Sequence, residues 1–342
     1  MLHRSSISYD PLAIIKGFDE TVGQLDKACS FGRSLANEIN RVVFVAAGSA
    51  NRAMLGLVWW IEHFSSGLEV RRYFPAEFMA QNPSCLGSKT LVVLASKSGT
   101  TPETVAAAEF VKNKPCKTVA FSQLSTKPLG QSASFVFTVG DETPESFTAI
   151  FMLMQAMVGG LLAERGEYDR ADALMSSLHA LPHAVTQAAV QNEQRAAADA
   201  KAYAKDGRIY HIASGPGFTT AYVFGVCILM EMLWIHSYPI EAAEFFHGPF
   251  EIVDKTVPLV LIKGEDPTRP LMDRVSRFCD QWAERVMVYD SKNFPMPGIA
   301  QEIRQIVAPY ILQAALKRFS SHLSLERNQP LSTRRYMWKV PY

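Results

Sequence analysis

The stretch TLVVLASKSGTTPET (residues 90–104) joins a short apolar run to a turn rich in hydroxyl groups. The run at 90–95 is continuously apolar rather than alternating, which is typical of a strand covered on both faces in a parallel sheet. A helical pattern that starts near Pro102 follows the turn. Strand, turn and helix in this order predict one unit of an α/β fold, in which ligands bind at the carboxyl ends of the strands.

Runs of the same kind recur along the chain, separated by longer stretches with helical periodicity. They lie at 41–48, 117–122, 135–140, 208–215, 257–264 and 285–290. Sliding the sequence on itself by 167 residues superposes four features without a gap: Gly48 on Gly215, 90–97 on 257–264, 117–122 on 284–289, and PAEF (75–78) on AAEF (242–245). We therefore expect two tandem doubly wound parallel-sheet (flavodoxin-like) sandwiches.

This repeat suggests a domain organisation for the whole chain. We expect leading helices at 1–38, a first domain at 39–168, a connecting helix at 169–205, a second domain at 206–325 and a C-terminal tail at 326–342 that covers the active site.

Composition and charge narrow the classes of partner. Nearly half the residues are apolar, which is enough for a large core. The net charge is +1 and the basic residues are scattered, which argues against nucleic acid or a membrane surface as the main partner. The longest apolar run, 149–163, falls short of a membrane span, and the N-terminus lacks the order of a signal peptide. Five widely spaced cysteines without a CxxC motif favour reduced thiols in the cytoplasm.

The turn at 96–104 is a candidate phosphate site. Ser96, Ser98 and Thr101 supply hydroxyl groups, Gly99 lets backbone approach a ligand, and the following helix start offers unpaired N–H groups. No Walker motif is present, so a nucleoside triphosphate is not implied. The alternative is an ordinary capped helix start. In the second copy the matching residues are KGEDPTR (263–269), whose acids would repel an anion, so we expect only the first copy to bind phosphate.

A second turn, AAGSANRA (46–53), is expected at the same edge of the first sheet. Gly48 and Ser49 end the strand there and would border a sugar. Asn51 could bind the same ligand or cap a helix.

The second copy carries an acid and a histidine. Glu231 lies in an otherwise apolar helical segment, where burial would raise its pKa and make it a general base, unless it faces solvent. His247 precedes a Gly-Pro step and could move a proton on a sugar oxygen, or be structural; His236 is a weaker candidate. Glu241 and Glu244 lie close by in the sequence, and Glu244 matches Glu77 of the first copy.

No cluster has metal spacing and neither GxSxG nor HExxH occurs, so we expect no metal, no cofactor and no nucleophilic serine.

These motifs together resemble the sugar isomerase (SIS) domain family. The resemblance rests on the two α/β copies, the SxSGxT turn at 96–101, the Gly-Ser pair at 48–49, and Glu231 followed sixteen residues later by the His-Gly-Pro segment at 247–249. The nearest branch is the isomerase half of glucosamine-6-phosphate synthase with the fructosamine (Amadori) 6-phosphate deglycases. The resemblance implies a 6-phosphate held at 96–101 and a sugar bordered by 48–49.

The same resemblance implies roles for three further residues. Glu231 would move a proton between C1 and C2 through an enediol or enolamine. His247 would help to open the ring, and in this family it often comes from the partner subunit, which implies a homodimer with its active site at the subunit interface. Lys339 in the tail is a candidate for handling the open-chain sugar.

Two departures favour the deglycases over the synthase. Ile228 stands where the synthase has a lysine, and a glutaminase domain is not found in this sequence. We therefore expect a deglycase that splits a fructosamine 6-phosphate into a glucose-type 6-phosphate and an amine or amino acid. The alternatives are a ketose–aldose phosphosugar isomerase, an amino-sugar-phosphate deaminase and a non-catalytic sugar-phosphate sensor.

Overall fold

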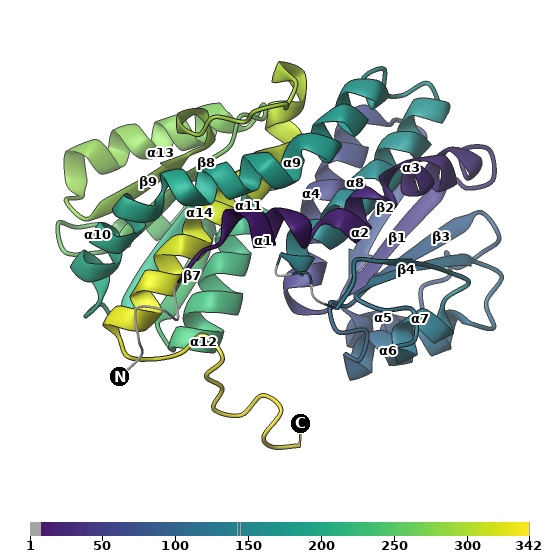
Figure 1. Ribbon diagram of the computed structural model, residues 1–342, viewed down its shortest axis with the longest axis horizontal. Coiled ribbons are helices and arrows are strands. Elements are labelled where there is room, and N and C mark those ends of the chain that lie inside the picture. The colour runs from purple at the N-terminus through teal and green to yellow at the C-terminus, as the bar shows by residue number, and fades with distance from the viewer. Residues whose placement is uncertain (1–7, 142, 144, 342) are drawn as a thin grey trace. The chain divides into compact units, whose positions relative to one another are not determined.

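The computed structural model describes residues 8–341 except 142 and 144, and the chain divides into two compact units. The N-terminal unit consists of Leu12–Pro182 with Gly298–Ile303. The C-terminal unit consists of His183–Pro297, the chain from Arg304 onward and the described residues up to Pro11. Each unit has its own parallel sheet (Figure 1).

The sheet of the N-terminal unit has the order β2-β1-β3-β4-β5, and all its pairs are parallel. Its strands are β1 (Arg41–Ala46), β2 (Glu69–Tyr73), β3 (Thr90–Ala95), β4 (Lys117–Ser122) and β5 (Phe135–Thr138). Every residue of β3 is buried, as its unbroken apolar run predicts.

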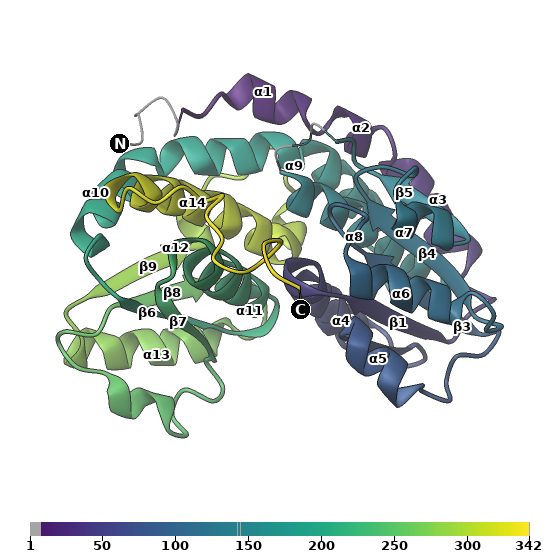
Figure 2. The same cartoon turned by 90° about the horizontal axis from the view of Figure 1, so that it is seen from below.

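Helices cover both faces of this sheet. Short helices α5 (Pro75–Gln81), α6 (Pro102–Val111) and α7 (Pro128–Ser132) lie on one side, and α3 (Leu25–Ser34) with α8 (Ser146–Glu164) on the other (Figure 2). The remaining helices are α1 (Pro11–Lys16), α2 (Asp19–Val22), α4 (Gly48–Phe64), η6 (Gln301–Ile303) and α9 (Ala171–Gln191), which runs into the C-terminal unit.

Helix α8 corrects one sequence prediction. The apolar run at 149–163 was expected to be too short for a membrane span, yet the helix has 19 residues and is long and apolar enough to cross a membrane. The described residues contain one other such helix, Gly215–Leu233. Because 89% of the apolar window of α8 is buried, the helix serves as a core element of its unit, which explains why it is apolar all round.

The sheet of the C-terminal unit has the order β7-β6-β8-β9, again entirely parallel. Its strands are β6 (Arg208–Ala213), β7 (His236–Glu241), β8 (Leu259–Lys263) and β9 (Val286–Asp290). Helix α13 (Arg269–Trp282) covers one face, and α14 (Arg304–Glu326) with α11 (Phe218–Tyr222) covers the other (Figure 2). The remaining helical elements are α10 (Glu193–Tyr203), η2 (Gly215–Gly217), η3 (Val223–Met230), α12 (Glu231–Leu233), η4 (Pro249–Ile252) and η5 (Ser291–Asn293).

The strand order confirms the two tandem parallel sheets that the sequence predicts. Strands β1 and β6 are related by the 167-residue shift, and the four strands of the second sheet follow the order of the first four of the first. Gly48 and Gly215, which the shift pairs, both have left-handed backbone, with φ of 56° and 50°. The two copies therefore share the same turn after their first strand.

Candidate functional site

The hydroxyl turn follows β3 and is held together by its own side chains. The buried Ser96 Oγ lies 2.8 Å from Thr101 Oγ1 and accepts a hydrogen bond from the Gly99 N–H at 3.2 Å. The exposed Ser98 Oγ accepts from the N–H and the hydroxyl of Thr100. The turn is therefore preformed, with Ser98 on its open side.

Glycine is required at position 99. Its φ is +66°, and a Cβ there would lie 2.6 Å from Cβ of Lys127. A side chain at this position would have to displace that residue from the turn. Lys127 immediately precedes α7, and the first carbons of its side chain lie against Gly99. The sequence does not identify Lys127 as a neighbour of this turn, because nothing near it in the sequence links it to residues so far upstream.

Helix α6 begins directly after the turn, as the sequence predicts. Pro102 occupies the first turn, and Thr101 precedes it without forming a side-chain capping bond. The hydroxyl of Thr101 bonds to Ser96 instead. Thr101 therefore does not cap the first N–H groups of α6, and a helix start of this kind can bind an anion or water.

The turn after β1 is open around Gly48 and Ser49. Gly48 is exposed, and apart from its chain neighbours and the backbone of its own helix, no heavy atom of the described residues lies within 4 Å of the position its Cβ would take. Asn51 is fully buried, and its amide donates to the carbonyl of Tyr73 at 2.7 Å while its oxygen accepts from Arg72. Asn51 therefore fixes β2 beside α4 and is not available to a ligand.

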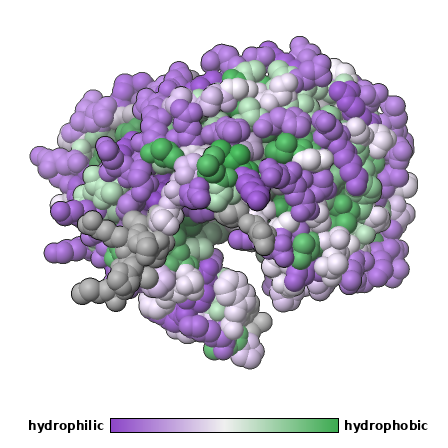
Figure 3. Space-filling view, viewed as in Figure 1, coloured by the Kyte–Doolittle hydropathy of each residue, from purple (hydrophilic) through white to green (hydrophobic). Residues whose placement is uncertain are grey.

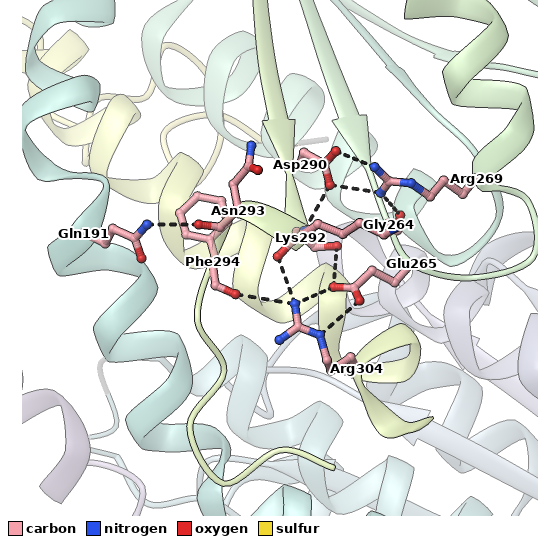
Figure 4. Close-up of polar contacts among 10 residues, drawn as sticks. Gln191, Gly264, Glu265, Arg269, Asp290, Lys292, Asn293, Phe294 and Arg304 are labelled. Atoms are coloured by element: carbon pink, nitrogen blue, oxygen red, sulfur yellow. Dashed lines mark hydrogen bonds and ion pairs between the residues drawn. The ribbon is translucent and has the colours of Figure 1, made fainter. Parts of the chain in front are cut away.

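The equivalent turn of the second copy is filled by its own acids. Figure 4 shows Glu265 facing Arg304, with two bonds of 2.8 and 3.0 Å, and Asp290 facing Arg269. Asp266 accepts from the backbone and hydroxyl of Thr268. The repeat pairs Ser98 with Glu265, so a carboxylate paired to arginine stands where the first copy has an exposed hydroxyl.

Replacing Glu265 by glutamine is expected to destabilise the C-terminal unit by about 3 kcal/mol, because it leaves Arg304 in a poorly solvated place without its counter-ion. The side chain of Glu265 is only 9% exposed and that of Arg304 only 15%. Urea unfolding measures the effect. The matched control is Lys255→Gln, which breaks the exposed pair with Glu284 and should cost less than about 0.5 kcal/mol. Equal midpoints for the two variants would contradict this reading of the turn.

Glu231 lies at an irregular point of its helix. It follows the π-helix η3 and opens the single turn α12, which ends on Trp234 in left-handed backbone with φ of 55°. Both π-helical turns and left-handed non-glycine residues are rare and concentrate at functional sites.

The carboxylate of Glu231 is half-buried and paired. Its Oε1 lies 2.7 Å from a guanidinium nitrogen of Arg334 in the tail, with the two side chains 26% and 9% exposed. Burial raises the pKa of Glu231, and Arg334 partly opposes this rise. The alternative of a solvent-facing acid does not hold, and the environment suits a general base.

A cavity of about 440 Å³ adjoins Glu231 within the C-terminal unit. Its lining comes from α12 and the residues around it and from the tail: Met230, Glu231, Trp234, Ile235, His236, Arg334, Arg335, Tyr336 and Met337. The histidine among the described lining residues is His236, the weaker of the two sequence candidates. His247 is not among the lining residues that the structure describes.

His247 lies on an exposed loop after β7. Its N–H donates to the carbonyl of Glu244 at 2.8 Å, and Gly248 follows with φ of 135°. Lys339 is exposed in the tail, and its Nζ donates to the carbonyl of Arg334 at 2.6 Å, which supports the segment that carries Arg334. Neither residue is brought beside Glu231 by these contacts.

Glu241 ends β7 at the carboxyl edge of the second sheet, opposite Ala213. Burial raises its pKa to about 7, and its side chain has no hydrogen-bond partner among the described residues. Among the same residues no group of three or more His, Cys, Asp or Glu could hold a metal ion.

Comparison with known proteins agrees with this architecture. The SIS domain model matches residues 35–161. The fructosamine deglycase FrlB of Bacillus subtilis (strain 168) is 38% identical over 308 residues, 89% of this chain and 93% of that protein. An agropine synthesis conjugase of Rhizobium rhizogenes is 37% identical over 314 residues, 89% of this chain and 87% of the relative. A Bacillus subtilis crystal structure, described as that of a phosphosugar isomerase, has a TM-score of 0.86 at 34% identity and covers 94% of this chain and 99% of that one. The chain therefore belongs to the SIS domain family.

Proposed function

We propose that this protein is a deglycase that cleaves fructosamine 6-phosphates. The observation that carries the proposal is the half-buried carboxylate of Glu231 at the wall of a cavity, in a chain 38% identical to a fructosamine deglycase. The product would be a glucose-type 6-phosphate together with the amine or amino acid that was joined to C1.

In the proposed mechanism Glu231 carries one proton from C1 to C2. The carboxylate removes a proton from C1 of the open-chain ketoamine, and the electron pair forms an enolamine. The oxygen at C2 takes up a proton from solvent in this step. Return of the first proton from Glu231 to C2, with loss of the N–H proton to solvent, leaves a C=N bond at C1 and a hydroxyl at C2, with no net oxidation. Water adds to C1, the C–N bond breaks, and the amine leaves with a proton. General base catalysis of this kind contributes roughly 10²–10⁴-fold to a rate.

The phosphate would bind at the turn of Ser96, Ser98, Gly99 and Thr101, with Gly48 and Ser49 bordering the sugar. The preformed hydroxyls and the start of α6 support this assignment. Binding at a distance from the reacting carbons gives uniform affinity, while the carboxylate lowers the barrier to C–H cleavage.

His247 would open the sugar ring of a substrate bound to a second copy of the chain, so that the working unit is a homodimer. Support comes from its exposure on the loop after β7. Lys339 would act on the open-chain sugar or, through its bond to Arg334, hold the tail. The five free cysteines support a cytoplasmic location.

The same residues could run the reaction backward and join an amine to a sugar. The 37% identity to a protein named a conjugase favours this second candidate. Assays in both directions separate the two, since a synthetic role requires net conjugate formation at physiological concentrations of the two halves.

The function is tested by incubating the protein with fructosamine 6-phosphates made from different amino acids. A deglycase releases the free amino acid and a glucose-type 6-phosphate in equal amounts. Release of ammonia would indicate a deaminase, and interconversion of aldose and ketose without release would indicate an isomerase. Thermal stabilisation by the ligand without turnover would indicate a sensor.

Replacing Arg334 by glutamine is expected to move the acid limb of the kcat/KM profile to higher pH. Glu231 must be ionised to act as a base. Burial raises its pKa, Arg334 lowers it, and removing Arg334 therefore raises it further. His236 and Arg335 also line the cavity and remain in the variant. Arg277→Gln, an exposed arginine of α13, is the control. An unmoved acid limb would contradict the assignment of Glu231.

A further inference from the structure

The cavity beside Glu231 has a chemical character of its own. Its volume of about 440 Å³ falls within the range of about 300–1,000 Å³ that small-molecule sites occupy. Met230, Ile235 and Met337 make part of its wall apolar, while Arg335 and Tyr336 bring polar groups from the tail. Such a wall suits a ligand with an aliphatic part and an anionic group.

The two neighbouring arginines of the tail differ in what they face. Arg334 is buried and its charge is matched by Glu231 at 2.7 Å. Arg335 is exposed, its guanidinium lies over the ring of Trp234 at 4.2 Å, and among the described residues it has no acidic partner. Stacking on an aromatic ring holds a guanidinium in place and leaves its N–H groups free for a carboxylate.

The orientation of Trp234 is set by strained backbone. Its φ of 55° ends α12 three residues after Glu231, and the residue is 41% exposed. A left-handed conformation costs free energy for a bulky residue, and here it supports the ring that carries Arg335. The tail itself is tied to α12 by Gln329, whose amide donates to the carbonyl of Met232 at 2.8 Å.

We propose that this cavity binds the amine portion of the substrate and that Arg335, stacked on Trp234, selects amines that carry a carboxylate. The proposal rests on the proposed function: if Glu231 acts at C1 and C2, the group attached to C1 lies next to it. The substrate class is then fructosamine 6-phosphates of aliphatic α-amino acids rather than of simple amines.

The test compares two substrates that differ by one carboxylate, the fructosamine 6-phosphates of valine and of isobutylamine. Wild type should have a kcat/KM at least about tenfold higher for the valine compound, the factor that a charge-assisted hydrogen bond contributes. In Arg335→Gln this ratio should fall to near one, chiefly through the KM of the valine compound. Trp234→Ala should lower the ratio in the same direction, since it removes the platform.

Arg277→Gln, which removes an exposed arginine from α13, should leave the ratio unchanged. A wild-type ratio near one, or a ratio that Arg335→Gln does not change, would overturn the carboxylate assignment while the deglycase function stands. Failure of wild type to release either amine would overturn the proposed function and this inference together. Circular dichroism of each variant shows that the fold is retained.

Discussion

Replacing Glu231 by glutamine is expected to remove measurable turnover, a loss of at least about 10³-fold in kcat. Glutamine has nearly the same shape, but its amide cannot accept the proton from C1. Binding of a glucose-type 6-phosphate should change little, because the proposed phosphate contacts come from residues 96–101 and not from Glu231. Steady-state kinetics and isothermal titration calorimetry measure the two effects separately.

The control for this variant is Glu244→Gln. Glu244 is an exposed acid after β7, and the repeat pairs it with Glu77. Its variant should keep turnover within about twofold, as exposed substitutions usually do. Full activity in Glu231→Gln would exclude this carboxylate as the base, and loss of sugar-phosphate binding together with turnover would point to a structural role.

Replacing Ser98 by glutamate should raise the KM for a 6-phosphorylated substrate by at least about 100-fold, since a like charge placed against a phosphate costs several kcal/mol. The second copy of the repeat already has a glutamate, Glu265, at the position that matches Ser98. Ser98 is exposed, so the longer side chain meets little steric resistance.

The matched control is Ser98→Gln, which has the same size without the charge. It should raise KM by less than about tenfold, the value of one lost hydrogen bond. If the glutamate and glutamine variants have the same KM, charge at this turn does not matter and the phosphate binds elsewhere.

Local signals in the sequence predicted most of the fold. All seven apolar runs contain strands, and the 167-residue repeat reappears as two sheets with matching strand order. The two strands that were missed, β2 and β7, are edge strands with sequences EVRRY and HSYPIE. An edge strand needs fewer apolar residues and tolerates a proline, so neither sequence has the unbroken apolar pattern.

The candidate site was predictable only where its residues are neighbours in the sequence. The hydroxyl turn is contiguous, so its motif and its helix start could be identified directly. The pairing of Glu231 with Arg334 depends on where an irregular tail lies, and no periodicity encodes that path. The ion pair of Arg304 with Glu265 likewise joins residues far apart in the sequence, and no local pattern predicts it. On the face shown in Figure 3, hydrophobic residues are scattered among hydrophilic ones.

The most direct test of proton transfer by Glu231 uses a fructosamine 6-phosphate with deuterium at both C1 positions. If the carboxylate removes one C1 hydrogen before the C–N bond breaks, the product is a glucose-type 6-phosphate that keeps one deuterium at C1. Mass spectrometry and NMR of the product read this number. A product that keeps both deuterium atoms at C1, as fructose 6-phosphate formed by direct cleavage of the C–N bond would, contradicts the mechanism.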